Sequence, residues 1–264
     1  MRERYAVVGN PVAHSRSPWI HAEFARASGH ELEYTAIEAP LDDFEGTVDR
    51  FRAAGGKGLN VTLPFKEAAF RYCGAVSQRA AAARAVNTLV LGETAFGDNT
   101  DGVGLVADFN NNLGLSLSGK AVLLMGAGGA AQGVVPALLD AGVAQLVIAN
   151  RSVGRAEALA ARFAVSASSY EALRGQTFDV VINATSAGLA SQAPSLPASV
   201  FKPASLAYDM VYGADTPFLA QARAAGARAW DGLGMLVEQA AESFLVWHGV
   251  RPDTRRVLER LRAA

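Results

Sequence analysis

Short apolar runs alternate with longer helical patterns along almost the whole chain. The short runs are rich in Val, Ile, Leu, Phe and Tyr, as β-strands are, and lie at residues 5–8, 32–37, 58–63, 88–91, 121–125, 145–149, 178–182, 206–210 and 227–230. Helical patterns separate most of them, at residues 17–27, 42–53, 130–141, 155–163, 217–225 and 234–247. Strands that alternate with helices predict parallel sheets with helical crossovers, and therefore an α/β fold.

The pattern predicts two domains, with a boundary where turn-forming residues end the first block of strands and helices. We expect the first domain at residues 1–104 and the second at residues 105–235, with a helix over 102–112 leading into it. Late strands that are almost continuous apolar runs predict a doubly wound sheet of five or six strands, covered on both faces. We expect the C-terminal helices, residues 236–264, to pack back on the first domain, and residues 186–205 to form a loop.

Composition narrows the class of protein. Half of the 264 residues are hydrophobic and 19% are charged, so the chain can bury a sizeable core. A formal net charge of −1 gives no long-range attraction to nucleic acid or to an anionic membrane, and we expect neither as a partner. The single cysteine, Cys73, excludes an internal disulfide, and four scattered histidines lack the spacing of a metal site. We therefore expect no metal.

No targeting segment is recognisable. The apolar run that follows the first charged residues stops at Gly9, which is too short for the core of a signal peptide. Residues 121–139 carry no charge, but their glycines and Pro136 favour a buried strand, a turn and a helix over a membrane span. The sequence predicts a soluble, cytoplasmic protein.

A glycine-rich turn follows the predicted strand at residues 121–125. Its sequence, Gly126-Ala127-Gly128-Gly129-Ala130-Ala131, has the form G-x-G-x-x-A and opens a helix. The first glycine allows a tight turn, the second lets backbone amides approach a pyrophosphate, and the last alanine keeps the helix close to the sheet. The helix N-terminus offers unpaired N–H groups to the phosphates. The second domain is therefore predicted to be Rossmann-like and to bind a dinucleotide; a glycine-rich turn without a ligand is the alternative.

The end of the next strand distinguishes NAD from NADP. A site for NAD usually carries Asp or Glu there, about 20 residues after the glycines, to bind the ribose 2′-hydroxyl. Here the strand is followed by Asn150-Arg151-Ser152, and Arg155 lies one helical turn further on. Two guanidinium groups can hold a 2′-phosphate through paired hydrogen bonds. The segment favours NADP(H) over the alternative of ordinary surface arginines.

A polar turn lies between the first predicted strand and the first predicted helix. Ser15 and Ser17 place hydroxyl groups near the helix N-terminus, which suits a carboxylate ligand. Ser17 directly before Pro18 is also the pattern of an ordinary helix cap. The local pattern leaves both interpretations open.

Other polar segments of the first domain also fall at predicted strand ends, where open α/β sheets bind ligands. Residues 60–66 end in Lys66, which is either a functional group or an ordinary surface lysine. Asn87 follows a helix, and residues 99–102, Asn-Thr-Asp-Gly, contain frequent turn dipeptides. Each segment alone is a weak signal, but their common position at strand ends indicates that they belong to one ligand site.

In order along the chain, these segments resemble the shikimate dehydrogenase family, the NADPH-dependent enzymes of aromatic amino-acid biosynthesis. The resemblance covers essentially the full length. It rests on Gly9-Asn-Pro-Val-Ala-His-Ser-Arg-Ser-Pro18, Asn60-Val-Thr-Leu-Pro-Phe-Lys66, Ala85-Val-Asn-Thr88, Asn99-Thr-Asp-Gly102, Gly126-Ala-Gly-Gly-Ala130, Asn150-Arg-Ser152, Asn183-Ala-Thr-Ser186, Tyr208-Asp-Met210 and Asp231-Gly-Leu-Gly-Met-Leu-Val-Glu-Gln-Ala-Ala241. So many motifs in order make a chance match negligible.

The resemblance implies a role for each matching residue. The substrate carboxylate would be bound by Ser15 and Ser17, and its ring hydroxyls by Thr62, Asn87, Asp101 and Gln239. The catalytic pair would be Lys66 and Asp101. The cofactor would be held by Gly126, Ala127, Gly128, Gly129, Ala130, Asn150, Arg151, Ser152, Arg155, Thr185, Met210, Tyr212 and Gly232.

The activity that the resemblance implies is reversible reduction of 3-dehydroshikimate to shikimate by NADPH, in a cleft between the two domains. A quinate/shikimate dehydrogenase of broader substrate and cofactor use is the nearest alternative, but Arg151 stands where its acidic residue would be expected. A methylenetetrahydrofolate dehydrogenase would lack the Ser15 and Ser17 segment. A non-catalytic sensor of pathway ligands would lose Lys66 or Asp101, and a scaffold protein would not need the cofactor loop. Family members occur as monomers and homodimers, and the sequence does not choose between them.

Overall fold

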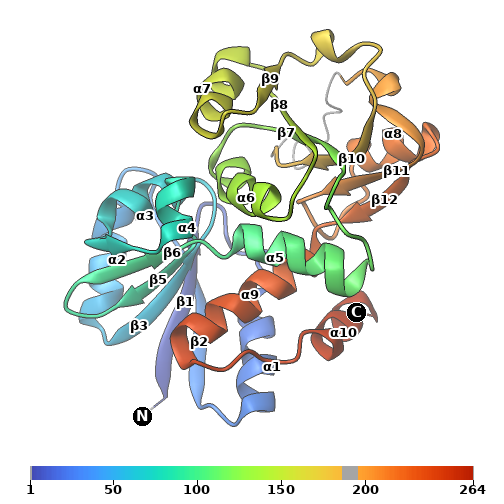
Figure 1. Ribbon diagram of the computed structural model, residues 1–264. Helices are drawn as coiled ribbons and strands as arrows, with labels where there is room; N and C mark the ends of the chain where they lie inside the picture. Colours follow the sequence, from blue (N-terminus) through green and yellow to red (C-terminus); the bar gives the residue numbers. More distant parts are fainter. Residues whose placement is uncertain (1, 186–195, 264) are drawn as a thin grey trace. The chain divides into compact units, whose positions relative to one another are not determined.

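The computed structural model describes residues 2–185 and 196–263 (Figure 1). The chain divides into two compact units, which we call the first unit (Met1–Ala107 with Leu236–Ala264) and the second unit (Asp108–Met235). Within the described part of the chain, no helix is both long enough and apolar enough to cross a membrane. Most of the predicted loop at residues 186–205, its residues 186–195, lies outside the described residues.

The first unit is built on a six-stranded sheet in the order β2-β1-β3-β5-β6-β4. Its strands are β1 (Glu3–Gly9), β2 (Leu32–Glu38), β3 (Gly56–Val61), β4 (Ala75–Val76), β5 (Thr88–Leu91) and β6 (Ala95–Asp98). Its helices are α1 (Ser17–Ser28), α2 (Phe44–Ala53), α3 (Lys66–Tyr72), α4 (Gln78–Ala83), α5 (Asp101–Ala107), most of α9 (Leu233–His248) and α10 (Arg255–Ala263). The last two return from the end of the chain (Figure 1).

Side chains of β1 alternate between two apolar layers, as the period of a strand requires. Ala6 and Val8 pack into the core that includes α2 and α3. Tyr5 and Val7 face the other way, into a cluster against which Trp247 of α9 packs. Trp247 Nε1 also donates a hydrogen bond of 3.0 Å to the Leu89 carbonyl oxygen. The C-terminal helix α9 is therefore part of the core of the first unit.

The sheet of the first unit is mixed, so the prediction of purely parallel sheets is wrong here. β5 is antiparallel to both β3 and β6, whereas β1 pairs in parallel with β2 and β3. Only residues 92–94 join β5 to β6, which is long enough for a hairpin but far too short for a parallel crossover. β6 is hard to recognise from its residues, because Gly97 and Asp98 are poor strand formers.

The second unit is an all-parallel sheet in the order β12-β11-β10-β7-β8-β9. Its elements are β7 (Ala121–Met125), α6 (Gly129–Asp140), β8 (Gln145–Ala149), α7 (Val153–Phe163), β9 (Ser166–Ser168), β10 (Phe178–Asn183), β11 (Phe201–Asp209), α8 (Pro217–Ala224) and β12 (Arg228–Asp231). From Val122 to Met125 every residue of β7 is fully buried, as expected for a strand covered on both faces. The predicted fold class is confirmed, with six strands in this sheet.

Three local predictions in and near the second unit differ from the structure. The helix expected over residues 102–112 ends as α5 at Ala107, and a single π-helical turn, Asp108–Asn112, follows. β9 was not predicted because its sequence, Ser-Ala-Ser, carries no large apolar residue. β11 begins at Phe201, where its side chain enters the core, so the end of the predicted loop is strand.

A buried histidine makes the stability of the first unit sensitive to acid. His21 of α1 stacks on Tyr34 with ring centroids 4.3 Å apart. Burial lowers the pKa of His21 from 6.5 to about 3, against the opposing effect of the Asn60 side chain. Below pH 6.5 the unfolded chain therefore binds a proton that the folded chain refuses, so stability falls as the pH drops from about 6.5 towards 3.

We predict that His21→Phe removes about 2 kcal/mol of the loss in unfolding free energy between pH 7.5 and pH 5, since one pKa unit corresponds to about 1.4 kcal/mol. Urea unfolding at both pH values measures it. The control is His14→Gln, because His14 is exposed and its replacement should leave the pH dependence as it is. An unchanged pH dependence in His21→Phe would contradict the prediction.

Candidate active site

Three strand ends of the first unit meet at one edge of the sheet. The pairing register places Asn60 of β3 opposite Thr88 of β5, and Thr88 opposite Asp98 of β6. Because β5 runs antiparallel to its neighbours, the residues after β3, before β5 and after β6 all leave the sheet at this edge. This register brings together the chain segments that carry Lys66, Asn87 and Asp101.

Lys66 and Asp101 form a close ion pair. The Lys66 Nζ atom lies 2.6 Å from Asp101 Oδ2, and the two side chains are 13% and 6% exposed. Each is the first residue of a helix, Lys66 of α3 and Asp101 of α5. The carboxylate is favourable at a helix N-terminus because of the partial positive charge there. The pair therefore presents an ammonium group in a mostly buried position, directed by a carboxylate.

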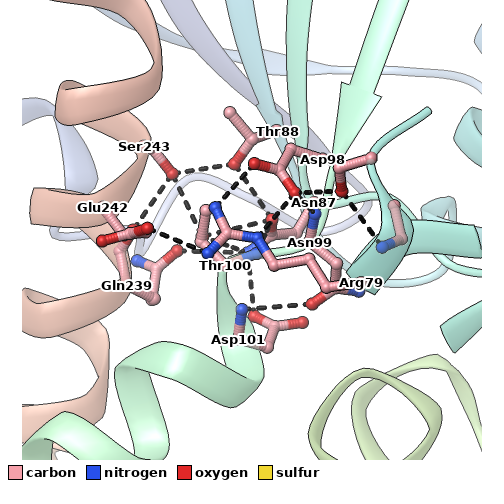
Figure 2. A network of polar contacts seen from close by, with 12 residues as sticks. Arg79, Asn87, Thr88, Asp98, Asn99, Thr100, Asp101, Gln239, Glu242 and Ser243 are labelled. Carbon is pink, nitrogen blue, oxygen red and sulfur yellow. Dashed lines mark hydrogen bonds and ion pairs between the residues drawn. The ribbon is translucent and has the colours of Figure 1, made fainter. Parts of the chain in front are cut away.

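Asn87 holds the other oxygen of the carboxylate. Its Nδ2 donates to Asp101 Oδ1 at 3.0 Å and makes a longer contact, 3.4 Å, with Oε1 of Gln239 from α9 (Figure 2). Its Oδ1 accepts the backbone N–H of Thr100 at 2.8 Å, a bond that fixes which end of the amide faces the carboxylate. The structure thus brings four of the predicted residues together: Lys66, Asn87, Asp101 and Gln239.

Of the predicted carboxylate ligands, Ser15 lies in the turn between β1 and α1, and Ser17 is the first residue of α1. This turn lies against residues 62–63: the Asn10 N–H donates to the Leu63 carbonyl oxygen, and Gly9 leaves no room for a side chain beside the Thr62 methyl group. Among the described residues, no hydrogen bond joins the side chains of Ser15, Ser17 or Thr62 to the Lys66 group. Their part in a common site stays a prediction.

The capping interpretation of Ser17 is wrong. The N-cap position of α1 is Arg16, no side chain caps this helix end, and Ser17 is already helical. Ser17 is buried, and its backbone N–H donates to Ser15 Oγ. Pro18 in the first turn starts the helix, so Ser17 is not needed as a cap.

The glycine turn of the second unit fits a pyrophosphate. Gly126 has φ of +107°, which other residues rarely adopt, and a Cβ there would lie only 3.1 Å from the Ala184 carbonyl oxygen. Gly128 is the N-cap of α6, and a Cβ on it would meet no atom within 4 Å. The backbone of Ala127 to Ala130 is thus open to close approach by phosphate oxygens at a helix N-terminus.

The end of β8 offers two cations to the adenosine side of a nucleotide. Arg151 and Arg155 are exposed, and neither forms an ion pair with any residue in the described part of the chain. The turn between them is held by Asn150, whose Nδ2 donates to the Ser152 carbonyl oxygen at 3.0 Å. Two unpaired guanidinium groups near the start of α7 are suited to a phosphate on the ribose.

The residues predicted for the nicotinamide side follow β10, β11 and β12. The Met210 N–H donates to the Asn183 carbonyl oxygen, and the Gly232 N–H donates to that of Val211. A Cβ on Gly232 would lie 2.5 Å from the Met210 carbonyl oxygen, so the close approach requires glycine. Thr185 donates to Asn183 Oδ1, and Tyr212 comes two residues after Met210. These residues lie at the carboxyl ends of adjacent strands, where parallel sheets bind cofactors.

The sequence alone assigns no role to the residues that hold the carboxyl ends of β10 and β11 together. Asp209 is fully buried and accepts hydrogen bonds from Thr216 Oγ1 (2.6 Å), the Val211 N–H (3.0 Å) and Asn183 Nδ2 (3.2 Å). Burial raises the pKa of Asp209, while these donors oppose the shift. The motifs around Asn183 and Asp209 are part of the family resemblance, but their spacing along the chain does not show that the two side chains meet.

Two α/β units, one of them an all-parallel sheet with a glycine turn at a helix N-terminus, are the architecture of nucleotide-dependent dehydrogenases. Three family models match, described as "Shikimate dehydrogenase substrate binding domain" (residues 7–89), "Shikimate / quinate 5-dehydrogenase" (109–196) and "Shikimate 5'-dehydrogenase C-terminal domain" (232–262). The NADP(+) shikimate dehydrogenase of Aromatoleum aromaticum is 58% identical over an alignment of 270 positions, which covers 98% of this chain and 97% of that protein. The chain belongs to the shikimate dehydrogenase family.

Solved structures agree with this assignment. The shikimate 5-dehydrogenase of Thermus thermophilus, solved with NADP(H) and shikimate, has a TM-score of 0.89 and 39% identity, with 99% of each chain covered. An Ael1 enzyme from Pseudomonas putida has a TM-score of 0.92 and 52% identity, with 98% of each chain covered. These findings confirm the predicted family, the prediction of an oxidoreductase and that of NADP(H) as its cofactor. The oligomeric state stays a prediction.

We predict that Thr216→Val destabilises the second unit by about 1–3 kcal/mol, the typical cost of leaving a buried polar group without its partner. Valine keeps the shape of threonine but cannot donate to Asp209 or accept from the Leu219 N–H at the start of α8. Urea unfolding monitored by far-UV circular dichroism measures the change. Thr216→Ser is the matched control because it keeps the hydroxyl; equal stability of both variants would contradict the prediction.

Proposed function

We propose that the chain catalyses the reversible reduction of 3-dehydroshikimate to shikimate by NADPH, with Lys66 as the group that gives and takes the proton. The observation that carries this proposal is the 2.6 Å contact between Lys66 Nζ and Asp101 Oδ2 at the strand-end site. This site also holds the amide groups of Asn87 and Gln239, which suit a polyhydroxylated ring. The reaction is a step of aromatic amino-acid biosynthesis.

The protein has to position two rings and handle one proton. NADPH, when bound, supplies the hydride. As negative charge develops on the carbonyl oxygen, the Lys66 ammonium donates a hydrogen bond and then the proton to that oxygen. Asp101 keeps the ammonium group directed at the substrate through the contact on its Oδ2. In the oxidation of shikimate, neutral Lys66 accepts the hydroxyl proton.

Substrate recognition uses groups that both donate and accept hydrogen bonds. The contact of 3.4 Å between Asn87 Nδ2 and Gln239 Oε1 is long, and a ring hydroxyl beside both atoms would accept from the first and donate to the second at shorter distances. Thr62 would hold a further hydroxyl. Ser15 and Ser17 would bind the carboxylate with their hydroxyl groups at the N-terminus of α1, where the partial positive charge of the helix favours an anion.

Cofactor binding uses the turn and strand ends of the second unit. The pyrophosphate would lie on the backbone of residues 126–130, at the N-terminus of α6. Arg151 and Arg155 would hold the 2′-phosphate, with Asn150 and Ser152 shaping the turn between them. The nicotinamide ring would contact the residues that follow β10, β11 and β12, namely Thr185, Met210, Tyr212 and Gly232.

A quinate/shikimate dehydrogenase of broader use is the second candidate. It is favoured by the description of the family model over residues 109–196, which names both substrates. Arg151, at the position of an acidic residue that would bind NAD, speaks against broad cofactor use. The sensor interpretation is disfavoured because Lys66 and Asp101 are both present and paired.

Steady-state absorbance of the nicotinamide decides between these functions. The assay pairs shikimate or quinate with NADP or NAD at matched concentrations. Rapid reduction of NADP with shikimate, and little with the other three pairs, is the expected result. Comparable turnover of quinate or NAD would favour the broader enzyme, and shikimate binding without turnover in any pair would favour the sensor.

Lys66→Ala is expected to lower kcat by about 10²-fold or more, the usual share of general acid–base catalysis, with a smaller change in KM for shikimate. The reason is that the variant lacks the proton donor but keeps Asn87 and Gln239 for substrate binding. Lys57→Ala is the matched control, because Lys57 is exposed in β3, the strand that leads to the site. A Lys66→Ala enzyme with unimpaired kcat would remove Lys66 from the chemistry.

The double variant Arg151→Ala and Arg155→Ala is expected to raise KM for NADP by about 10-fold or more, because each lost charged contact to a phosphate contributes about 1.5–3 kcal/mol in favourable cases. KM for NAD, which has no 2′-phosphate, should change little. Arg228→Ala is the control, since Arg228 is exposed at the start of β12, the opposite end of the same sheet. Equal losses with NADP and NAD would show that the arginines do not read the 2′-phosphate.

A further inference from the structure

Arg79 joins the strand-end site to helix α9. From α4 it forms a two-pronged ion pair with Asp98 at the end of β6, with Nε–Oδ1 and Nη2–Oδ2 distances of 2.7 and 2.6 Å. Its remaining nitrogen, Nη1, donates to Glu242 Oε1 of α9 at 2.9 Å (Figure 2). One guanidinium group thus bridges two carboxylates that come from distant parts of the chain.

The Asp98 end of this bridge controls the turn that carries Asp101. Asp98 Oδ1 also accepts the Asn99 N–H at 2.7 Å and the Ser77 hydroxyl. Asn99 Oδ1 in turn accepts the Asp101 N–H at 3.1 Å. The backbone direction at which Asp101 leaves the sheet therefore follows from the position of the Asp98 carboxylate.

The Glu242 end controls the helix segment that carries Gln239. Glu242 lies three residues after Gln239 and thus close to one helical turn away. The next residue, Ser243, donates to the Gln239 carbonyl oxygen and hydrogen-bonds with the Thr88 hydroxyl on the sheet. Arg79 is the one cation labelled in Figure 2, and it contacts both Asp98 at the end of β6 and Glu242 of α9.

The bridge is mostly shielded from water, so its ion pairs are weakened little by solvent. The Arg79 side chain is 30% exposed, while those of Asp98 and Glu242 are 6% and 13% exposed. Burial acts to raise the pKa of Asp98, but the Arg79 and Ser77 hydrogen bonds outweigh it and lower that pKa below its usual value. A planar guanidinium fixes the directions of all three bonds, which an ammonium group cannot do.

We propose that Arg79 is a positioning residue for the dehydrogenase reaction: it sets the distance between Asp101 and Gln239, and with it the place of the substrate ring relative to Lys66. Arg79 does not touch the substrate. The inference rests on the proposed function, in which Asp101 and Gln239 contact the ring. A small displacement of reacting groups can cost a large factor in rate, so loss of the bridge is felt in turnover.

Arg251 provides a matched control. Its Nη2 lies 2.8 Å from Glu238 Oε2, and its Nη1 contacts the second oxygen of Glu242. Arg251 therefore shares one carboxylate with Arg79 and ties the same helix, but it makes no contact with Asp98. Loss of either arginine removes an ion pair on α9, but only loss of Arg79 removes the charged link between α9 and Asp98; the 3.2 Å contact between the Ser243 and Thr100 hydroxyls remains in both variants.

The test compares Arg79→Gln with Arg251→Gln in the full-length enzyme. For Arg79→Gln we expect kcat/KM for shikimate to fall about 10-fold or more, while KM for NADP stays within about two-fold, because the bridge lies wholly in the first unit. For Arg251→Gln we expect both constants to stay near wild type, even if thermal stability falls. Unchanged kinetics in a folded Arg79→Gln enzyme, or equal kinetic losses in both variants, would overturn the proposal.

Two further variants separate position from charge. Arg79→Lys keeps the positive charge but not the fork, so we expect thermal stability near wild type with kcat/KM still reduced; full kinetic recovery would overturn the proposal. Glu242→Gln keeps the Asp98 pair but weakens the contacts of Glu242 with both Arg79 and Arg251, so its effect is compared with that of Arg251→Gln. Here KM for shikimate should rise by a larger factor than kcat falls, and this variant decides the question if Arg79→Gln does not fold.

Wild-type enzyme in the same assay separates this inference from the proposed function. If the wild type oxidises quinate rather than shikimate, the proposed function is overturned and the ratios of variant to wild type are measured with quinate. If it oxidises neither, both are overturned. If the wild type is active and all variants have the same kinetic constants as the wild type, only the positioning role is overturned.

Discussion

The register of β3, β5 and β6 is the constraint on which the substrate-side site depends. Because the pairing sets Asn60, Thr88 and Asp98 side by side, three chain segments leave the sheet at neighbouring points. A shift of one residue in this register would turn every side chain of the strand to the opposite face. Backbone pairing thus brings the segments of Lys66 and Asp101 together, and the side-chain bonds of Asp98 and Asn99 then direct Asp101 towards Lys66.

Buried polar groups around this edge are held by one another. Asn60 is buried, accepts from the Tyr34 hydroxyl and donates to Ser243, so even the residue behind the site has partners at both ends of its amide. Such a network is costly unless its members are satisfied, and when they are satisfied it favours one arrangement over all others. The same hydrogen bonds therefore offset the unfavourable burial of these polar groups and keep the segment that leads to Lys66 rigid.

Much of the fold and of the site follows from the sequence, but not the contacts between distant segments. The glycine turn could be assigned because its function is local: strand, turn and helix are consecutive in the chain. Lys66 and Asp101 were recognised only through family motifs, since nothing in their spacing shows that they touch. The antiparallel pairing of β5 with β6 was not predicted. It follows from the three-residue connection between the two strands, which apolar periodicity does not reveal. Arg79 had no signal beyond ordinary polarity, and the motif that contains Asp209 did not show its contacts, because the partners of both residues lie far along the chain.

The first unit is interrupted in sequence, since α9 and α10 complete it after the whole second unit has passed. During synthesis, residues 108–235 are all present before Gln239, Glu242 and Trp247 leave the ribosome. Until then Gly58 faces an unfilled position where the Trp247 ring belongs, and Arg79 lacks its second carboxylate. The nascent chain therefore cannot assemble the substrate-side site before its C-terminus is made, while every strand that carries the nucleotide turn is already available for pairing.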